Sequence, residues 1–517
     1  MRPARFPASI AYIPMPVKRN ITEVVEFGDF QTPESLAAQV TLLLRNMGLK
    51  PTAILEPTCG KGSFVSAASA NFPEAEFICG VEVNSDYIEI AKGLTTDSRV
   101  RFFEGDFFKL DWSVIFAQSK GPWLILGNPP WVTNSKLGAI SSSNLPTKQN
   151  DRKLKGIEAI TGKSNFDISE WMILRYLEWL KNGYVIAILC KVTVARKILS
   201  HAWENSVPID LAAIFRIDAM RNFNVAVDAC LFVVRAGACE SKSCEIYDNL
   251  DSATPSSTLS YIDGQIVKGA SDYRRGRHLL GVDPNYRWRS GVKHDCSKVM
   301  ELTHTNSGYV NGLEEHVDIE DTFLYPMYKS SGLSAKPRTA RKMLVPQRYP
   351  GEDVSEIKAV APKTWAYLTR HRDLLRKRGS SIYKNKGDFA IFGVGPYSFT
   401  PWKVAISGFY KRLLFTVVGP IENRPVVFDD TVYYISCYSE AEATFMADLL
   451  NSEITRSLLE SLIHWESKRP ITVELLKQVS LAEVAREVGR LTEYRRLVDS
   501  ADPVEHSLGT YGLFQTC

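Results

Sequence analysis

The sequence predicts an α/β fold in which a mostly parallel sheet carries helices on both faces, followed along the chain by a mixed α+β region. Residues 21–240 alternate short apolar runs with amphipathic segments, which is typical of parallel strands joined by crossover helices. The chain of 517 residues is also too long for one hydrophobic core, because single cores stop growing at about 250–300 residues. We therefore expect an N-terminal extension over residues 1–20, a first domain over 21–240 and a second domain over 241–517.

The composition excludes several classes of protein. With 45% hydrophobic and 23% charged residues, the chain is neither disordered nor a coiled coil. Its 62 basic and 58 acidic residues give a net charge of only +4, so binding to a nucleic acid would have to come from local clusters of charge. No apolar run approaches the length that spans a bilayer, and the nine cysteines show no CxxC pair or zinc spacing. We expect a cytoplasmic protein with no membrane segment and no bound metal.

The elements of the first domain follow in order. Thr32 suits the N-cap of a helix and Pro33 suits its first position. An amphipathic helix is expected over residues 167–180. Residues 251–269, rich in Ser and Thr, are expected to form a linker or a long surface loop, and helices are expected beyond Asn451. Apolar runs predict the strands of the sheet, which we place at residues 52–57, 77–83, 100–105, 123–126, 184–190, 211–215 and 225–234.

A glycine-bearing turn follows the first predicted strand, with the sequence Glu56-Pro57-Thr58-Cys59-Gly60-Lys61-Gly62. Gly60 and Gly62 would let the backbone approach a ligand closely at the N-terminus of the next helix. Glu82 ends the second strand, where an acidic residue can hold ribose hydroxyls. The dinucleotide pattern lacks its third glycine, because Val65 stands there, and no P-loop is present. The pattern predicts a nucleotide-like ligand without a polyphosphate; a turn that only packs a helix on a strand is the alternative.

Two further positions follow the third strand, in Gly105-Asp106-Phe107-Phe108. The carboxylate of Asp106 could accept from an exocyclic amine, and Phe107 could cover a purine face. A lone Gly-Asp-Phe is a weak signal. It becomes more specific here because it follows Glu56, Gly62 and Glu82 in register.

The segment Asn128-Pro129-Pro130-Trp131 ends the fourth strand, at the edge where open α/β sheets bind their ligands. An amine attached to a heteroaromatic ring is a poor nucleophile, because its lone pair is delocalised into the ring. The Asn128 side-chain oxygen and the Pro129 carbonyl could accept both of its N–H groups, and the prolines would hold these acceptors in place. Trp131 offers a face on which a base could stack. A proline-rich strand end with a core tryptophan is the alternative.

These residues resemble a known family. Asn128-Pro129-Pro130-Trp131 resembles the [DNS]-P-P-[YFW] motif of amino-methyltransferases that use S-adenosylmethionine, and its Asn form is typical of N6-adenine DNA methyltransferases. The other motifs of that family resemble, in order, Phe30-Gln31-Thr32-Pro33, Glu56 to Gly62, Glu82, and Asp106-Phe107. The motif order resembles the gamma class, with a C-terminal target recognition domain. The resemblance covers residues 28–235 and implies a class I methyltransferase fold, Rossmann-like, with a mostly parallel seven-stranded sheet.

The resemblance also implies a role for each matching residue. Phe223 would be a second aromatic against a flipped base, together with Trp131, which departs from the commoner Tyr. The resemblance places the catalytic residues at Asn128, Pro129, Pro130 and Trp131. It places the S-adenosylmethionine-binding residues at Thr32, Pro33, Glu56, Pro57, Cys59, Gly60, Gly62, Glu82, Asp106 and Phe107.

Clusters of basic residues predict contacts to double-stranded DNA. In the loop over residues 132–163 they stand among Ser and Asn residues, and in several stretches of the second domain they are interleaved with aromatics. A solvated surface is the alternative for both. Residues 468–472 also resemble a segment near the end of such recognition domains. The DNA-binding candidates are Lys136, Lys403, Lys411, Arg412, Lys468 and Arg469.

The sequence therefore predicts a monomeric, nucleoid-associated DNA adenine-N6 methyltransferase of restriction–modification type, with a cognate restriction endonuclease as a possible partner. Methylation of cytosine N4, of an RNA base or of a protein glutamine amide uses similar chemistry and stays open. The large basic and aromatic C-terminal region argues against the glutamine enzymes. A non-catalytic DNA-binding subunit is the alternative from another class, and the intact Asp106, Glu82 and Asn128 argue against it.

Overall fold

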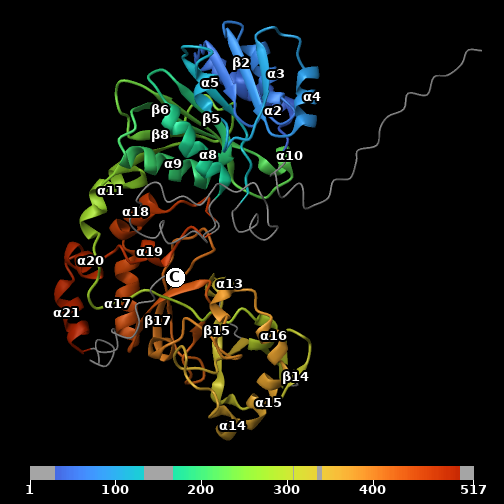
Figure 1. The fold of residues 1–517 in the computed structure, drawn as a ribbon. Helices are drawn as coiled ribbons and strands as arrows, with labels where there is room; N and C mark the ends of the chain where they lie inside the picture. Colours follow the sequence, from blue (N-terminus) through green and yellow to red (C-terminus); the bar gives the residue numbers. More distant parts are fainter. Residues whose placement is uncertain (1–29, 133–166, 307, 335–340, 468, 501–517) are drawn as a thin grey trace, which may run out of the picture. The chain divides into compact units, whose positions relative to one another are not determined.

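The computed structural model describes residues 30–132, 167–306, 308–334, 341–467 and 469–500, which divide into two compact units between Thr258 and Leu259 (Figure 1). The predicted extension over residues 1–20, most of the loop over 132–163, and the candidates Lys136 and Lys468 lie outside the described residues. None of the described helices is long and apolar enough to cross a membrane.

The first unit is built on a mostly parallel sheet with the strand order β3-β2-β1-β4-β5-β7-β6-β8. Among these eight described strands, only β7 runs antiparallel to its neighbours, β5 and β6. The seven predicted strands are all present, and β8 adds one more, parallel to β6. The strands are β1 (Ala53–Glu56), β2 (Phe77–Glu82), β3 (Val100–Glu104), β4 (Trp123–Gly127), β5 (Val185–Lys191), β6 (Ile209–Ile217), β7 (Ala229–Ala236) and β8 (Ser243–Tyr247).

Helices connect these strands, and α4, α5, α8 and α10 begin at an Asn or Asp side chain that caps them. The Asn84 side chain accepts from the first N–H groups of α4, and Asp167 accepts from Ser169 at the start of α8. Pro33, rather than Thr32, is the N-cap of α2, and no side chain of the described residues bonds the first N–H groups of this helix. The helices are α2 (Glu34–Asn46), α3 (Ser63–Asn71), α4 (Ser85–Gly93), α5 (Trp112–Phe116), α8 (Ile168–Trp179), α9 (Val192–Glu204) and α10 (Ala219–Phe223).

The core of this unit explains the apolar runs of the sequence. Strands β1 and β4 are buried along their whole length, as expected of central strands covered on both faces. Because β1 to β4 run parallel, their carboxyl ends meet at one edge of the sheet. The sequence places Glu56, Glu82, Asp106 and Asn128 at or just after those ends.

The predicted linker over residues 251–269 is wrong. Residues 257–268 form an antiparallel hairpin of β9 (Ser257–Ile262) and β10 (Gln265–Lys268). Asp263 and Gly264 form its turn, with φ of 50° and 80°, and such a left-handed Asp-Gly pair favours a two-residue hairpin. The alternation of Leu259 with polar neighbours carried the signal, but the high Ser and Thr content masked it.

The second unit contains two further antiparallel-rich sheets, and the helices predicted beyond Asn451 are present as α18 to α21. The four-stranded sheet has the order β11-β20-β17-β18, with β11 (Arg289–Ser290), β17 (Trp402–Ser407), β18 (Thr416–Val418) and β20 (Val432–Cys437). The six-stranded sheet has the order β14-β13-β12-β16-β15-β19, with β12 (Glu301–Thr305), β13 (Gly308–Asn311), β14 (His316–Val317), β15 (Leu324–Tyr328), β16 (Arg341–Leu344) and β19 (Val427–Phe428). The helices are α11 (Ala270–Gly276), α12 (Ser297–Met300), α13 (Ser330–Ser334), α14 (Ile357–Val360), α15 (Pro362–Arg370), α16 (Arg372–Arg376), α17 (Glu440–Asn451), α18 (Glu453–Leu462), α19 (Val473–Leu476), α20 (Leu481–Glu487) and α21 (Leu491–Ser500).

Lys403 is not a DNA-binding residue, contrary to the prediction. It lies on the central strand β17 and is only 1% exposed. Its Nζ donates to the Thr400 carbonyl, at 2.5 Å. Burial lowers the pKa of Lys403 to about 7. Strand β17 is buried on both faces from Lys403 to Ser407, so this lysine has no route to solvent, which a run of basic and aromatic residues does not reveal.

Candidate functional site

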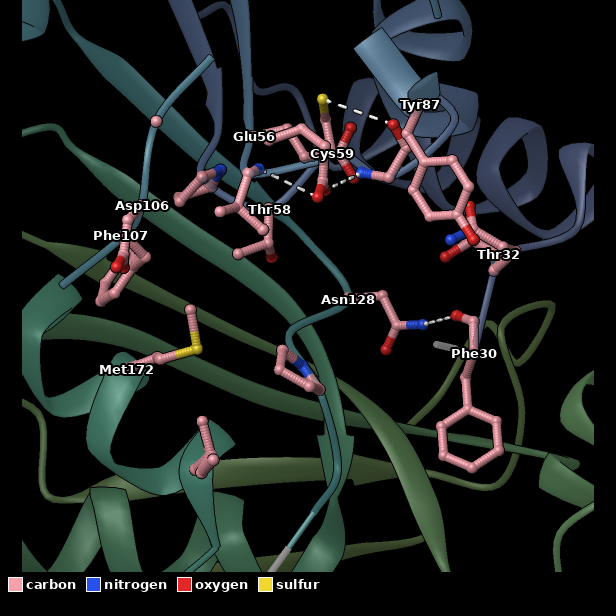
Figure 2. Close-up of a pocket in the computed structure, with 18 of the residues that line it drawn as sticks. Phe30, Thr32, Glu56, Thr58, Cys59, Tyr87, Asp106, Phe107, Asn128 and Met172 are labelled. Atoms are coloured by element: carbon pink, nitrogen blue, oxygen red, sulfur yellow. Dashed lines mark hydrogen bonds between the residues drawn. The ribbon is translucent and has the colours of Figure 1, made fainter. Parts of the chain in front are cut away.

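An open pocket lies at the carboxyl ends of β1 to β4 (Figure 2). The predicted residues that line it are Thr32, Glu56, Pro57, Cys59, Gly60, Glu82, Asp106, Phe107, Asn128 and Pro130. Pro33, Gly62, Pro129, Trp131 and Phe223 are not among the lining residues. The pocket therefore gathers side chains from five separate predicted motifs at one place.

The turn after β1 is held by contacts to its neighbours. The backbone N–H of Gly60 donates to Glu82 Oε2, at 2.8 Å, and the N–H of Lys61 donates to Gln31 Oε1, at 3.0 Å. Gly60 has a φ of 50°, and a Cβ there would lie 2.7 Å from Gln31 Oε1. A side chain at Gly60 would therefore displace both the turn and Gln31.

Gly62 allows two helices to pack closely in this structure, although we predicted that it binds the cofactor. Its φ is 85°, and a Cβ there would lie 2.8 Å from the Cβ of Ala91 on α4. The close approach it allows is therefore between the start of α3 and α4, and not between the backbone and the pocket.

Glu56 is the most buried carboxyl group of the pocket, at 4% exposed. Burial raises its pKa well above the usual value; an N–H bond from the Val65 backbone opposes this and the nearby Glu82 adds to it. Its Oε2 atom has no hydrogen-bond partner among the described residues. Burial also raises the pKa of the neighbouring Cys59 thiol, and the charges of Glu56 and Glu82 raise it further.

Asp106 and Phe107 line the far side of the pocket, next to α8. The Asp106 carboxylate accepts from the Phe108 backbone and pairs with Lys109, at 3.0 Å. Phe107 is buried in a cluster of aromatic rings, with centroids 5.1–6.2 Å from its own, formed by Phe108, Trp112, Trp171, Tyr176 and Trp179. Only part of the Phe107 ring is therefore free to meet a ligand.

The Asn128 amide has a fixed orientation. Its Nδ2 donates to the Phe30 carbonyl, at 3.0 Å, as Figure 2 shows. This contact turns Oδ1 the other way, and Oδ1 is buried without a hydrogen-bond donor among the described residues. A buried acceptor left without a donor costs about 1–3 kcal/mol, so it is retained where something else supplies the donor.

The aromatic side chains after Asn128 pack against each other outside the pocket. Trp131 is 7% exposed, and its indole N–H donates to the Leu189 carbonyl, at 3.1 Å. Phe223, on α10, meets the Trp131 ring edge-on, with 5.1 Å between centroids. The two rings predicted to flank a base are thus neighbours, but they touch each other and leave no gap for a base between them.

Several lining residues were not among the predicted site residues. Phe30 and Gln31 belong to the quoted Phe30-Gln31-Thr32-Pro33 segment, so a signal for them existed. Tyr87 on α4 and Met172 on α8 line the pocket because helix packing brings them there. No local pattern distinguishes them from ordinary core or surface positions.

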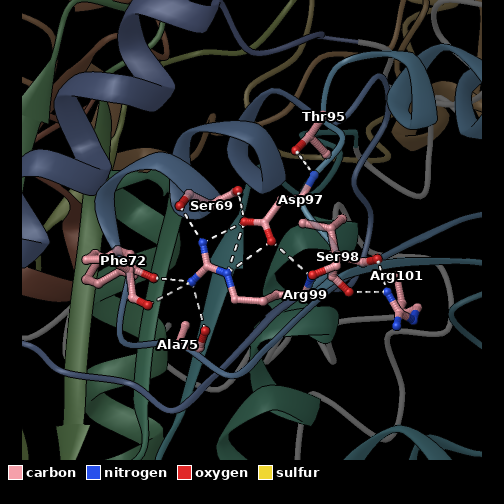
Figure 3. Close-up of polar contacts among 10 residues, drawn as sticks. Ser69, Phe72, Ala75, Thr95, Asp97, Ser98, Arg99 and Arg101 are labelled. Carbon is pink, nitrogen blue, oxygen red and sulfur yellow. Dashed lines mark hydrogen bonds and ion pairs between the residues drawn. The ribbon is translucent and has the colours of Figure 1, made fainter.

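Strand β3, which leads to Asp106, is anchored at its opposite end by Arg99 (Figure 3). The guanidinium donates to the carbonyls of Ser69, Phe72 and Ala75, at 2.8–2.9 Å, and pairs with Asp97. Hydrogen bonds from Arg99 and Ser69 lower the pKa of the Asp97 carboxyl. One side chain therefore joins the end of α3 to the start of β3.

Replacing Arg99 with Ala should lower the free energy of unfolding by about 2–3 kcal/mol, because several carbonyls lose a charged donor together. Arg99→Lys should recover only part of this, since an ammonium cannot reach carbonyls in several directions. Urea denaturation measures both. Arg101→Ala, at an exposed neighbouring position, is the control and should change little; an equal loss in both variants would contradict the anchoring role.

One relative decides the family. The type II methyltransferase M.NspV of Nostoc sp. is 44% identical to this chain over 470 residues, which are 89% of this chain and 98% of the relative. The chain belongs to the type II methyltransferases. M.CvrRI of Paramecium bursaria Chlorella virus XZ-6E, also a type II methyltransferase, matches a shorter stretch, 33% identical over 107 residues, which are 20% of this chain and 25% of that relative. No protein-family model matches the chain.

The methyltransferase also resembles a solved structure. The type IIL restriction-modification enzyme MmeI, determined in complex with DNA, matches it with a TM-score of 0.53 at 14% identity. The match covers 89% of this chain, which spans 65% of the length of the MmeI chain. At this identity the likeness concerns the fold, and it confirms the class I architecture with a further domain.

S-adenosylmethionine is the methyl donor of this methyltransferase. The pocket fits that cofactor on three counts. It lies at a strand-to-helix turn with a left-handed glycine, its lining includes the carboxyl groups of Glu56, Glu82 and Asp106, and two of its buried acceptor atoms have no donor among the described residues. A cation with hydroxyl and amine groups complements such a lining. Among the described residues no cluster of His, Cys, Asp and Glu could hold a metal ion.

Proposed function

We propose that this type II methyltransferase transfers a methyl group to the N6 amine of adenine in double-stranded DNA, with the base flipped out of the duplex. The observation that carries the proposal is the orientation of Asn128. Its nitrogen is committed to the Phe30 carbonyl, so its Oδ1 is the atom left to accept a hydrogen bond from a substrate. An amine attached to an aromatic ring supplies that donor.

The chemistry then rests on positioning. Asn128 Oδ1 and the Pro129 carbonyl would accept the two N–H groups of the amine and so favour a pyramidal nitrogen, whose lone pair faces the methyl donor. The Phe30 carbonyl keeps Oδ1 in place before the substrate arrives, so no reorganisation is needed during the reaction. The bound cofactor supplies an electrophilic methyl group. Asp106, Phe107 and Glu82 would hold its adenine and ribose ends.

The flipped base would stack on Trp131. Because the Phe223 ring now lies against Trp131, stacking requires that Phe223 move away or that the base approach another part of the indole. Five-residue helix α10 carries Phe223 at its last position, and Asn224 follows in a left-handed conformation. A ring at the end of so short a helix can shift without disturbing a strand.

The second unit would act as the target recognition domain, as in the gamma class. The β17–β18 connection presents Tyr410, Lys411 and Arg412 on the surface. Arg469, by contrast, lies over the Phe409 ring at 4.7 Å and pairs with Asp430, so its charge is partly committed. Lys411 and Arg412 are therefore the stronger of the described candidates for phosphate contacts.

Lys411→Ala and Arg412→Ala together should weaken DNA binding and make it less sensitive to salt. Each lost phosphate contact should lower the slope of log affinity against log salt by about 0.9. Fluorescence anisotropy with a DNA duplex at several salt concentrations measures this. Lys477→Ala, at an exposed lysine that was not a DNA-binding candidate, is the control; an unchanged slope in the double variant would place the phosphate contacts elsewhere.

The proposal includes a monomeric enzyme that acts in the cytoplasm at the nucleoid, beside a restriction endonuclease that cuts the same site. The decisive experiment is transfer of a tritiated methyl group from S-adenosylmethionine to duplex DNA, followed by analysis of the modified nucleosides. N6-methyladenine supports the proposal. N4-methylcytosine, or label found only in RNA, would overturn the choice of target, and no label in any DNA would favour a non-catalytic subunit.

A further inference from the structure

The segment of residues 128–131 leaves the sheet without the backbone hydrogen bonds that hold a strand. The last pair of the β4–β5 ladder is Gly127 with Ile188. Pro129 and Pro130 have no N–H group, so this part of the chain cannot donate to a ladder. Its direction therefore depends on contacts made by side chains.

Such contacts occur at both ends of the segment. At its start, the Asn128 amide donates to the Phe30 carbonyl, at 3.0 Å. At its end, the Trp131 indole N–H donates to the Leu189 carbonyl, at 3.1 Å. The Trp131 carbonyl accepts from Lys191 Nζ, at 3.5 Å. Lys191 thus supplies a charged donor to the backbone where the segment ends.

Lys191 is itself held by its neighbours. It is the last residue of β5, and it pairs with Ala229 of β7. Its ammonium pairs with Asp167 Oδ2, at 2.6 Å, and the two side chains are 22% and 8% exposed. Asp167 Oδ1 accepts from the backbone N–H and the hydroxyl of Ser169, at 3.1 and 2.6 Å. The carboxylate is therefore fixed by α8, and it keeps the ammonium beside the Trp131 carbonyl.

Stability alone is a weak reason for such a pair. Charges that leave water lose their hydration, and the attraction between them offsets that loss at best. A lysine ammonium has three N–H donors, so one can bond the Asp167 carboxylate while another faces a carbonyl. The position of the pair, at the end of the segment that holds the amine, points to a role in the reaction.

A second ion pair joins neighbouring positions and offers a comparison within the same chain. Lys197 of α9 pairs with Glu170 of α8, at 2.8 Å, and the side chains are 59% and 11% exposed. Both acids lie at the start of α8, where Asp167 is the N-cap and Glu170 is in the first turn. Of the two pairs, the one formed by Lys191 contacts the Trp131 carbonyl.

We propose that Lys191 is a positioning residue for methyl transfer. Its ammonium, held by Asp167, fixes the Trp131 carbonyl. The end of the segment of residues 128–131 is then fixed, and with it the direction in which Asn128 Oδ1 meets the amine. The inference rests on the proposed function and adds to it a residue that is not among those lining the cofactor pocket.

The lining of the pocket separates this role from a purely structural one. Ile168 and Met172 of α8 line the cofactor pocket. If the ion pair only seated α8, its loss would displace these two side chains and weaken cofactor binding. If it fixes the Trp131 carbonyl, its loss should slow the transfer step and leave the cofactor affinity unchanged.

Single-turnover transfer from tritiated cofactor at saturation to unmethylated plasmid DNA measures this step in the full chain. Lys191→Met should lower the rate by about 10–50-fold, because the reacting groups are no longer held in line. The dissociation constants for S-adenosylmethionine and for DNA should change by less than about 3-fold. Lys191→Arg should recover most of the rate, since a guanidinium can bond the carboxylate and the carbonyl together. Lys197→Met is the matched control and should keep the wild-type rate.

Asp167→Asn provides a second variant that keeps the cap of α8 but removes the charge that orients Lys191. It should also slow the transfer step. The double variant Lys191→Met/Asp167→Asn should be slower than Lys191→Met by no more than about 3-fold, because both changes act on the same carbonyl. Losses that multiply in the double variant would contradict a shared action through Trp131.

Three other outcomes would overturn the inference. They are a wild-type rate in Lys191→Met, an equal loss of rate in Lys197→Met, and a loss of cofactor or DNA affinity that accounts for the loss of rate. None of them concerns the target base, because the label reports the rate whichever base receives the methyl group. The proposed function fails separately, if the wild-type product contains no N6-methyladenine.

Discussion

Asn128→Ala should lower the rate of methyl transfer by about 10²–10³-fold, the usual loss when one preorganised polar contact to a reacting group is removed. The reason is that Oδ1 is the acceptor whose direction the Phe30 carbonyl fixes. Without it the amine keeps its lone pair in the ring and the nitrogen stays a weak nucleophile. Single-turnover rates at saturating cofactor and DNA measure this loss independently of product release.

Asn128→Asp separates the role of the acceptor oxygen from that of the amide N–H group. It keeps an acceptor oxygen but replaces the donor to Phe30, so a carboxylate oxygen and a carbonyl would face each other at about hydrogen-bond distance. We expect its rate to fall between those of wild type and Asn128→Ala. Asn46→Ala, at the exposed last position of α2, is the control. Near-wild-type turnover of Asn128→Ala with normal cofactor and DNA binding would refute the mechanism.

Lys403→Met should stabilise the protein at pH 6 by a few kcal/mol, because it removes a cation from the core. The pKa of Lys403 is about 7 in the folded chain and about 10.4 in an unfolded one, so burial of the charged form costs on the order of 4–5 kcal/mol. The bond to the Thr400 carbonyl offsets part of that cost. Methionine fills similar space without a charge.

The stability of the wild type should increase with pH because of Lys403. Between about pH 7 and pH 10.4 the unfolded chain binds a proton that the folded chain does not, so the stability of the wild type rises with pH over this range. The advantage of Lys403→Met should therefore be largest below pH 7 and shrink toward pH 10. Urea denaturation at pH 6, 8 and 10 measures it. Lys411→Met, at an exposed position, should show no such trend, and the same trend in both variants would contradict the assignment.

Lys403 and Lys411 show a property that the sequence did not predict, which is whether a basic residue is buried. Both stand in stretches of basic and aromatic residues, and both were predicted to contact DNA. The tertiary structure shows that Lys403 lies on a central strand, between β20 and β18, that is buried on both faces. A charge pattern cannot show that a strand is covered in this way when the strand itself is not recognised.

The hairpin over residues 257–268 is a second example, with a different cause. The sequence contains its Asp263-Gly264 turn, but the surrounding Ser and Thr residues are typical of a loop and mask the two strands. Trp131 and Phe223 are a third. Their proximity was predicted. Their edge-on contact depends on how α10 packs, which the sequence alone does not predict.

The sequence by itself determined the parallel sheet, the glycine turn after β1 and the set of residues at the strand ends, because strand period, helix caps and turn residues are local properties of the chain. The tertiary structure decided which of those residues share a pocket, which way the Asn128 amide points, and which carboxyl group is left without a partner. Those depend on contacts between residues far apart in the chain, such as Asn128 with Phe30, and on burial, which alone sets whether a lysine or a glutamate keeps its charge.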